Sequence, residues 1–75
     1  MAISLVIVIR SRHSWWVDWE GRPYGPMQTV EEAIASARRL ISLYGEESRR
    51  YEIYAPDEHG KMLPVATAVE GGEGL

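Results

Sequence analysis

The chain has 75 residues, of which 45% are hydrophobic and 25% are charged, and its formal net charge is -3 at pH 7. This size and composition suit one globular domain with a small hydrophobic core. The lack of cysteine excludes disulfide bonds and thiolate metal sites, and the acidic balance excludes a global attraction to nucleic acid or to anionic membranes. The apolar run Ile3 to Ile9 is too short to span a bilayer and has no basic segment before it, so we expect a cytoplasmic protein without a membrane partner.

Two strands are predicted at the start of the chain. Ile3 to Arg10 is rich in β-branched residues and apolar on both faces, which favours a central strand. Residues 11–13 form a polar turn, and Ser14 to Glu20 alternates between apolar and polar residues, which is typical of a second strand in a hairpin with the first. Gly21 to Pro26 contains two glycines and two prolines and is predicted to be a loop.

Helical periodicity is clearest from Thr29 to Tyr44, where apolar residues recur at steps of three and four. Thr29 and Glu32 have the spacing of a capping box, and Gly45 is expected to end the helix in a left-handed conformation. The apolar stripe of this helix consists of Val30, Ala33, Ile34, Ala37, Leu40, Ile41 and Tyr44.

Two more strands are predicted after the helix, at Arg50 to Ala55 and at Lys61 to Val69. Pro64 cannot donate a backbone hydrogen bond, so the last strand is expected at an edge. The predicted fold is therefore α+β: a four-stranded antiparallel sheet in the order 2-1-3-4 with one helix packed on one face. The domain is expected to span residues 1–69, followed by a flexible, glycine-rich tail at residues 70–75.

One helix covers only one face of such a sheet. The face beneath the helix is expected to carry Ile3, Leu5, Ile7, Ile9, Trp15, Val17, Trp19, Tyr51 and Ile53. The opposite face is expected to carry Val6, Val8, Trp16, Tyr54, Ala66 and Ala68, with Asp18 and Glu20 at its rim. Uncovered apolar faces usually mark partner sites, so we expect a twofold homodimer that buries Trp16. The alternative is that these residues are ordinary surface residues and that the C-terminal segment folds over the sheet.

Three polar clusters are weighed as catalytic or metal sites. Residues of the turn Asp57–His59 include metal-ligating types, but consecutive turn residues point in different directions, and a solvated turn explains them. His13 beside Ser14 lacks an identifiable orienting carboxylate, and Asp18 with Glu20 are interpreted as solvent-facing charges. We therefore expect no enzyme activity, no metal and no cofactor.

A basic set consists of Arg10 and Arg12 at the first turn and of Arg49 and Arg50 near the third strand. If these residues meet in space, they form a patch for an anion or for nucleic acid. The alternative is that they are solvated loop charges, in keeping with the acidic net charge.

The pattern W-x-V-x-W-E-G, followed by T-V-E-E-A-I-x-x-A-R-R-L, resembles small bacterial domains of unknown function with two strands, a helix and further strands. The matching residues are Trp15, Val17, Glu20, Gly21, Thr29, Glu32, Ala33, Ala37 and Leu40. This resemblance covers residues 8–54 and implies a fold without an activity.

The same segment is also similar to the arm-type DNA-binding domains of phage integrases and to plant AP2-like domains. These place a three-stranded sheet before such a helix and read DNA with the outer face of the sheet. Here two strands are expected before the helix, and Trp16, Asp18 and Glu20 stand where phosphate binding needs arginine or lysine. The sequence thus predicts a small non-enzymatic interaction domain that self-associates, with nucleic-acid binding as the alternative.

Overall fold

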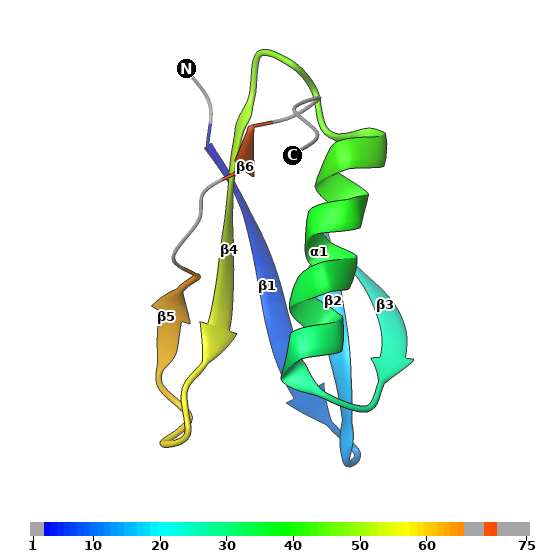
Figure 1. The fold of residues 1–75 in the computed structure, drawn as a ribbon, viewed down its shortest axis with the longest axis vertical. Helices are drawn as coiled ribbons and strands as arrows, with labels where there is room; N and C mark the ends of the chain where they lie inside the picture. The colour runs from blue at the N-terminus through cyan, green and yellow to red at the C-terminus, as the bar shows by residue number, and fades with distance from the viewer. Residues whose placement is uncertain (1–2, 66–68, 71–75) are drawn as a thin grey trace.

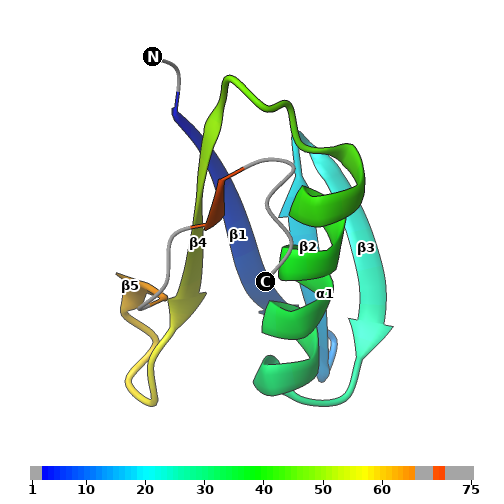
Figure 2. The ribbon, with the colours of Figure 1, turned by 45° about the horizontal axis from the view of Figure 1, so that its top comes forward.

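The computed structural model describes residues 3–65 and 69–70, in which one helix packs on one face of a β-sheet (Figure 1 and Figure 2). In chain order, the elements are β1 (Ile3–Ser11), β2 (Ser14–Trp19), β3 (Arg22–Met27), α1 (Val30–Tyr44), β4 (Arg50–Pro56), β5 (Met62–Pro64) and β6 (Val69–Glu70). The strands lie in the order β3-β2-β1-β4-β5, and β6 pairs with β4. The predicted α+β class is confirmed.

The sheet is mixed, which corrects the prediction that every strand pair is antiparallel. β1 pairs in parallel with β4, with Val6 opposite Ile53, whereas β1–β2, β2–β3 and β4–β5 are antiparallel pairs. The reason is that α1 returns the chain from the end of β3 to the start of β4, and such a crossover joins strands that run in the same direction. The predicted order 2-1-3-4 corresponds to β2-β1-β4-β5, with β3 added at the edge.

The strand β3 replaces the loop that was predicted for residues 21–26. Both residues of the turn before it have positive φ, at 52° for Glu20 and 86° for Gly21, which is typical of a two-residue hairpin turn. The prolines of β3 are tolerated because β3 lies at the edge of the sheet. An edge strand has a neighbouring strand on one side only, so some of its positions need no backbone N–H donor. Three strands, instead of the predicted two, therefore precede α1.

The start of α1 agrees with the predicted capping box, but its end does not agree with the prediction. Thr29 Oγ1 accepts a hydrogen bond from the N–H of Glu32 at 3.1 Å, and Glu32 Oε1 accepts one from the N–H of Gln28 at 2.9 Å. The predicted left-handed stop at Gly45 is wrong, since its φ of -71° and ψ of 148° are extended. Its N–H instead donates to the carbonyl of Ile41 at 2.8 Å.

The first hairpin reverses the predicted faces of β1. Its turn consists of two residues, Arg12 and His13, both with positive φ, instead of the predicted three residues 11–13. Val8 is therefore paired with Val17, and a shift of one residue exchanges the two faces of a strand.

As a result, Val6 and Val8 lie beneath α1, where they are 1% and 0% exposed, although they were expected on the opposite face. The residues of β1 that lie on the opposite face, although they were expected beneath the helix, are Ile3, Leu5, Ile7 and Ile9.

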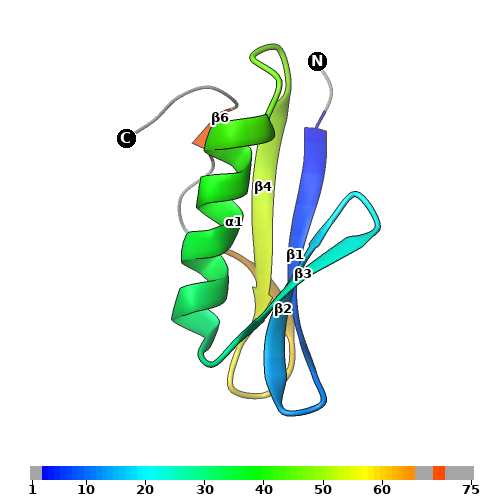
Figure 3. The same ribbon diagram turned by 90° about the vertical axis from the view of Figure 1, so that its right-hand side faces the viewer.

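The hydrophobic core lies between α1 and the sheet, and Figure 3 shows the helix on one side of the strands only. Trp19 and Tyr51 stack in it, with ring centroids 5.5 Å apart, and the hydroxyl of Tyr51 accepts a hydrogen bond from the N–H of Glu46 at 2.9 Å. Tyr44, predicted on the apolar stripe of the helix, is exposed. The buried side chains are those of Val6, Val8, Val17, Trp19, Ala33, Ala37, Leu40, Ile41, Tyr51, Ile53 and Ala55.

Part of the predicted C-terminal region lies outside the described residues, namely residues 66–68, with Ala66 and Ala68, and residues 71–75 of the tail. The predicted strand Lys61 to Val69 corresponds to the shorter strands β5 and β6, and Glu70 pairs with Arg50 in β6 instead of belonging to the tail. Within residues 3–65 and 69–70, no helix has the length and apolar character needed to cross a membrane.

Candidate interaction surface

Figure 3 shows that one face of the sheet is turned away from α1. This face carries apolar side chains of β1, several of them exposed. Because alternate residues of a strand point to opposite faces, the burial of Val6 and Val8 beneath α1 places their neighbours here. Ile3 and Leu5 are 56% and 52% exposed. We call this surface the open face and define it by Ile3, Leu5, Ile7, Ile9, Trp16, Asp18, Glu52 and Tyr54.

The open face has an apolar row along β1, with polar groups beside it. Trp16 and Asp18 of β2 lie on one side of this row, and Glu52 and Tyr54 of β4 lie on the other. In the middle of the row, Ile7 stands in register with both Asp18 and Tyr54. The hydroxyl of Tyr54 donates to Glu52 Oε1 at 3.4 Å, a long hydrogen bond that leaves the group available for a better partner.

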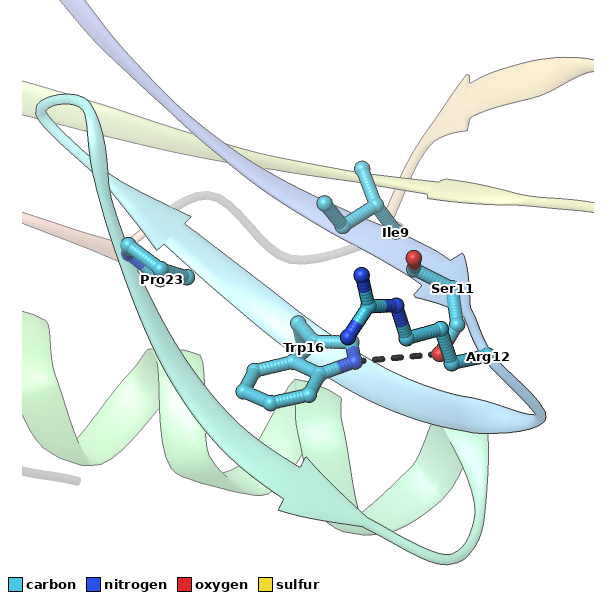
Figure 4. A pocket seen from close by; sticks show the side chains of 5 residues that line it. All are labelled: Ile9, Ser11, Arg12, Trp16 and Pro23. Carbon is cyan, nitrogen blue, oxygen red and sulfur yellow. Dashed lines mark hydrogen bonds between the residues drawn. The ribbon is translucent and has the colours of Figure 1, made fainter.

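A shallow pocket of about 290 Å³ opens beside Trp16, and its lining residues are shown in Figure 4. The indole N–H of Trp16 donates a hydrogen bond to the carbonyl of Ser11 at 3.2 Å, which orients the ring. Ile9 and Pro23 supply apolar walls, and Arg12 lines the same pocket (Figure 4). The pocket therefore combines an apolar surface with one cation.

Two of the four predicted interface residues lie on the open face. Trp16 and Tyr54 are half-buried on the open face, whereas Val6 and Val8 are core residues and their predicted place in the interface is wrong. Sequence reasoning missed the alternate residues of β1, such as Leu5, because this strand is apolar on both faces and its composition does not tell one face from the other. The length of the first turn is the signal that could have decided between them.

The four arginines predicted as an anion patch do not come together. Arg10 and Arg12 lie at the end of β1, whereas Arg50 pairs with Ile3 at its start, about 23 Å away along the strand. Arg49 and Arg50 each have a carboxylate oxygen within 4.0 Å. The arginines therefore form two separate groups, and one of these groups is partly neutralised by neighbouring acids.

The turn Asp57–His59 uses its aspartate to stabilise its own backbone. Asp57 Oδ1 accepts hydrogen bonds from the N–H groups of His59 at 2.8 Å and of Lys61 at 2.9 Å. This is the role that aspartate commonly has in turns. In the described part of the chain, no group of three or more His, Cys, Asp or Glu side chains is arranged to hold a metal ion.

Comparisons with known proteins found no matching family model, no matching curated protein and no matching solved structure. The resemblance to small bacterial domains and to DNA-binding domains stays a prediction. Function is therefore argued from the residues of the open face.

Proposed function

We propose that the protein is a small non-enzymatic interaction domain that self-associates through the open face. The observation that carries this proposal is the apolar row on the central strand β1, in which Ile3, Leu5 and Ile9 are exposed and Ile7 is half-buried. Soluble proteins seldom leave a contiguous apolar patch uncovered unless a partner binds there. Trp16 beside the row supports the proposal, because tryptophan is enriched in interface cores.

The size of the open face suits a dimer. The molecule measures 34 × 23 × 20 Å, and Figure 1, viewed down the shortest axis, presents the sheet across the two longer dimensions. This cross-section is an upper limit on the area of the open face, and it is close to the ~800 Å² that each partner buries in a standard protein interface. Two copies related by a twofold axis would each cover the apolar row of the other.

The test is the mass in solution, measured by light scattering on a size-exclusion column over a range of concentrations. We expect the wild-type protein to reach twice its chain mass of 8.5 kDa. Leu5→Asp should give a monomer, because a carboxylate at this exposed site is harmless in water but would be desolvated at an apolar interface.

Leu43→Asp is the matched control. Leu43 is 64% exposed on α1, away from the open face, so the same substitution there should leave the dimer intact. Both variants should keep the helical circular dichroism signal. A wild-type protein that stays monomeric at every concentration would refute the proposed function.

Nucleic-acid binding, the alternative from the sequence, would need its arginines to act together. The distance between Arg12 and Arg50 along β1 argues against one phosphate-binding patch, and Asp18 and Glu52 add negative charge to the face between them. A gel-shift series that starts at low salt tests this alternative. We expect no shift, whereas binding that weakens steeply with added salt would favour nucleic acid.

A further inference from the structure

The two strands at the edges of the sheet both contain proline. β3 lies at one edge and carries Pro23 and Pro26, and β5 lies at the other and carries Pro64 (Figure 1). The outer side of an edge strand has backbone N–H and C=O groups that can pair with a strand of another chain. A proline removes one of the donors on that side when its nitrogen points outward, and the register of the sheet determines this direction.

In β3, the nitrogen of Pro23 points outward. Trp19 and Arg22 stand on either side of a two-residue turn, so they form a hydrogen-bonded pair. Hydrogen-bonded and non-hydrogen-bonded pairs alternate along an antiparallel ladder, which makes the next pair, Asp18 with Pro23, a non-hydrogen-bonded one. The backbone groups of Pro23 therefore face away from β2, and the outer side of β3 has no donor at this position. Further along β3, an irregularity in the register interrupts the edge again.

The nitrogen of Pro64 in β5 points outward as well. The N–H of Val65 donates to the carbonyl of Ile53 at 2.7 Å, and the N–H of Asp57 donates to the carbonyl of Lys61 at 2.9 Å. These bonds mark the hydrogen-bonded pairs of the ladder between β4 and β5. Pro64, directly before Val65 in the chain, therefore belongs to a non-hydrogen-bonded pair and faces away from β4.

For the edges that residues 3–65 and 69–70 form, we infer that neither accepts a further strand, so that a partner binds this protein through side chains and not through strand addition. On the outer side of β5, Met62 has the one N–H, because Leu63 points inward and Pro64 has none. β6 continues this edge for only two described residues. Strand addition depends on a row of main-chain hydrogen bonds, which these edges do not supply.

For a second copy, this inference rests on the self-association proposed above and restricts its geometry. The two copies keep separate sheets, and the open face of each meets the other through its side chains. Stacked sheets lie ~10 Å apart, whereas paired strands of one sheet lie ~4.8 Å apart. The two modes of association therefore differ in whether the backbones of the two copies come close.

Nuclear Overhauser contacts in a dimer of one isotope-labelled and one unlabelled copy distinguish these modes. We expect contacts between the copies from side chains of the open face, such as that of Leu5, and none that join backbone protons of the two copies. Contacts between backbone protons of β3 or β5 and those of the second copy would overturn the inference.

Replacing the prolines tests whether they keep the edges closed. In the Leu5→Asp background, which is expected to be monomeric, Pro64→Val returns an outward N–H to β5 in each copy. Two such hydrogen bonds should strengthen association by about tenfold, as measured by light scattering over a range of concentrations. Pro23→Val should have the same effect at the β3 edge, and valine suits a strand, so both variants should keep the wild-type circular dichroism signal.

Pro56→Val is the matched control, since it exchanges the same residue types near Pro64. Pro56 directly precedes Asp57, whose N–H faces β5, so the nitrogen of Pro56 points to the β1 side of β4 and opens no edge. Pro56→Val should therefore associate no more strongly than the Leu5→Asp protein. If Pro64→Val and Pro23→Val also behave like this control, the prolines do not close the edges and the inference is wrong.

These outcomes separate the inference from the function on which it rests. A monomeric wild-type protein would refute self-association, while the proline variants in the Leu5→Asp background would still test the edges. Backbone contacts between two wild-type copies would instead leave self-association in place and show that it proceeds through a sheet edge.

Discussion

The two faces of β1 carry similar apolar residues but differ strongly in their exposure to solvent. Val6 and Val8 are sealed beneath α1, whereas Leu5, between Val6 and Ser4 in the chain, has about half of its surface in water. The apolar character of both faces makes sense if both are covered when the protein is at work. The buried residues of β1 stabilise the single copy, whereas its exposed residues are available to bind a partner.

The largest effect expected from this comparison is a difference between two isoleucines. Ile41→Ala removes a fully buried side chain of α1 and should lower the free energy of unfolding by about 2–5 kcal/mol. Ile9→Ala, on the open face, should cost about 1 kcal/mol, because its side chain already contacts water and leaves little cavity. Denaturant unfolding in the Leu5→Asp background, which is expected to be monomeric, measures both values without a contribution from dimerisation. Equal losses at the two sites would show that the open face is part of the core of a single copy.

The helix and the central order of strands could be predicted from the sequence because they depend on strong local signals. Thr29 and Glu32 mark the start of α1 through bonds that the chain makes with its near neighbours. Which face of β1 lies beneath α1 does not follow from local signals of this kind. It depends on whether Ser11 belongs to the turn or to the strand, and Arg12 and His13 are not residues that usually signal a two-residue turn with positive φ.

β3 was missed for a related reason. Its prolines argue against a strand in isolation, and only its place at the sheet edge makes them acceptable. That place is a property of the tertiary structure. The candidate surface was consequently predicted on the correct side of the sheet, with Trp16 and Tyr54, but with the wrong residues of β1.

A smaller effect is expected at Gly25 of β3, which packs closely against Trp15 and against the ring of Trp16 on the open face. A Cβ atom at this position would lie 2.9 Å from the carbonyl oxygen of Trp15 and 3.0 Å from Cε3 of Trp16. Gly25→Ala should therefore cost about 1–3 kcal/mol and displace the Trp16 ring, since backbone cannot yield as a side chain can. Unfolding curves give the first value, and the tryptophan fluorescence spectrum reports the second.

Gly21→Ala is the matched control for Gly25, because a Cβ at Gly21 meets no atom within 4 Å. Its positive φ of 86° makes some loss of stability expected there too, but no change in the surroundings of Trp16. A Gly25→Ala protein with unchanged fluorescence and wild-type stability would contradict the close packing of β3 against Trp16.

The smallest effect expected contrasts the two tyrosines of β4, which point to opposite faces. Tyr51→Phe removes the acceptor of a 2.9 Å hydrogen bond from the Glu46 N–H beside the core, and it should cost about 0.5–1.5 kcal/mol. Tyr54→Phe removes only a 3.4 Å contact with Glu52 on the open face, so the monomer should change by less than about 0.5 kcal/mol. The order should reverse when dimerisation is measured, because Tyr54 lies on the open face that is proposed to self-associate, whereas Tyr51 lies in the core. A Tyr54→Phe protein that dimerises as tightly as the wild type, while Tyr51→Phe weakens the dimer, would assign the two faces the wrong way round.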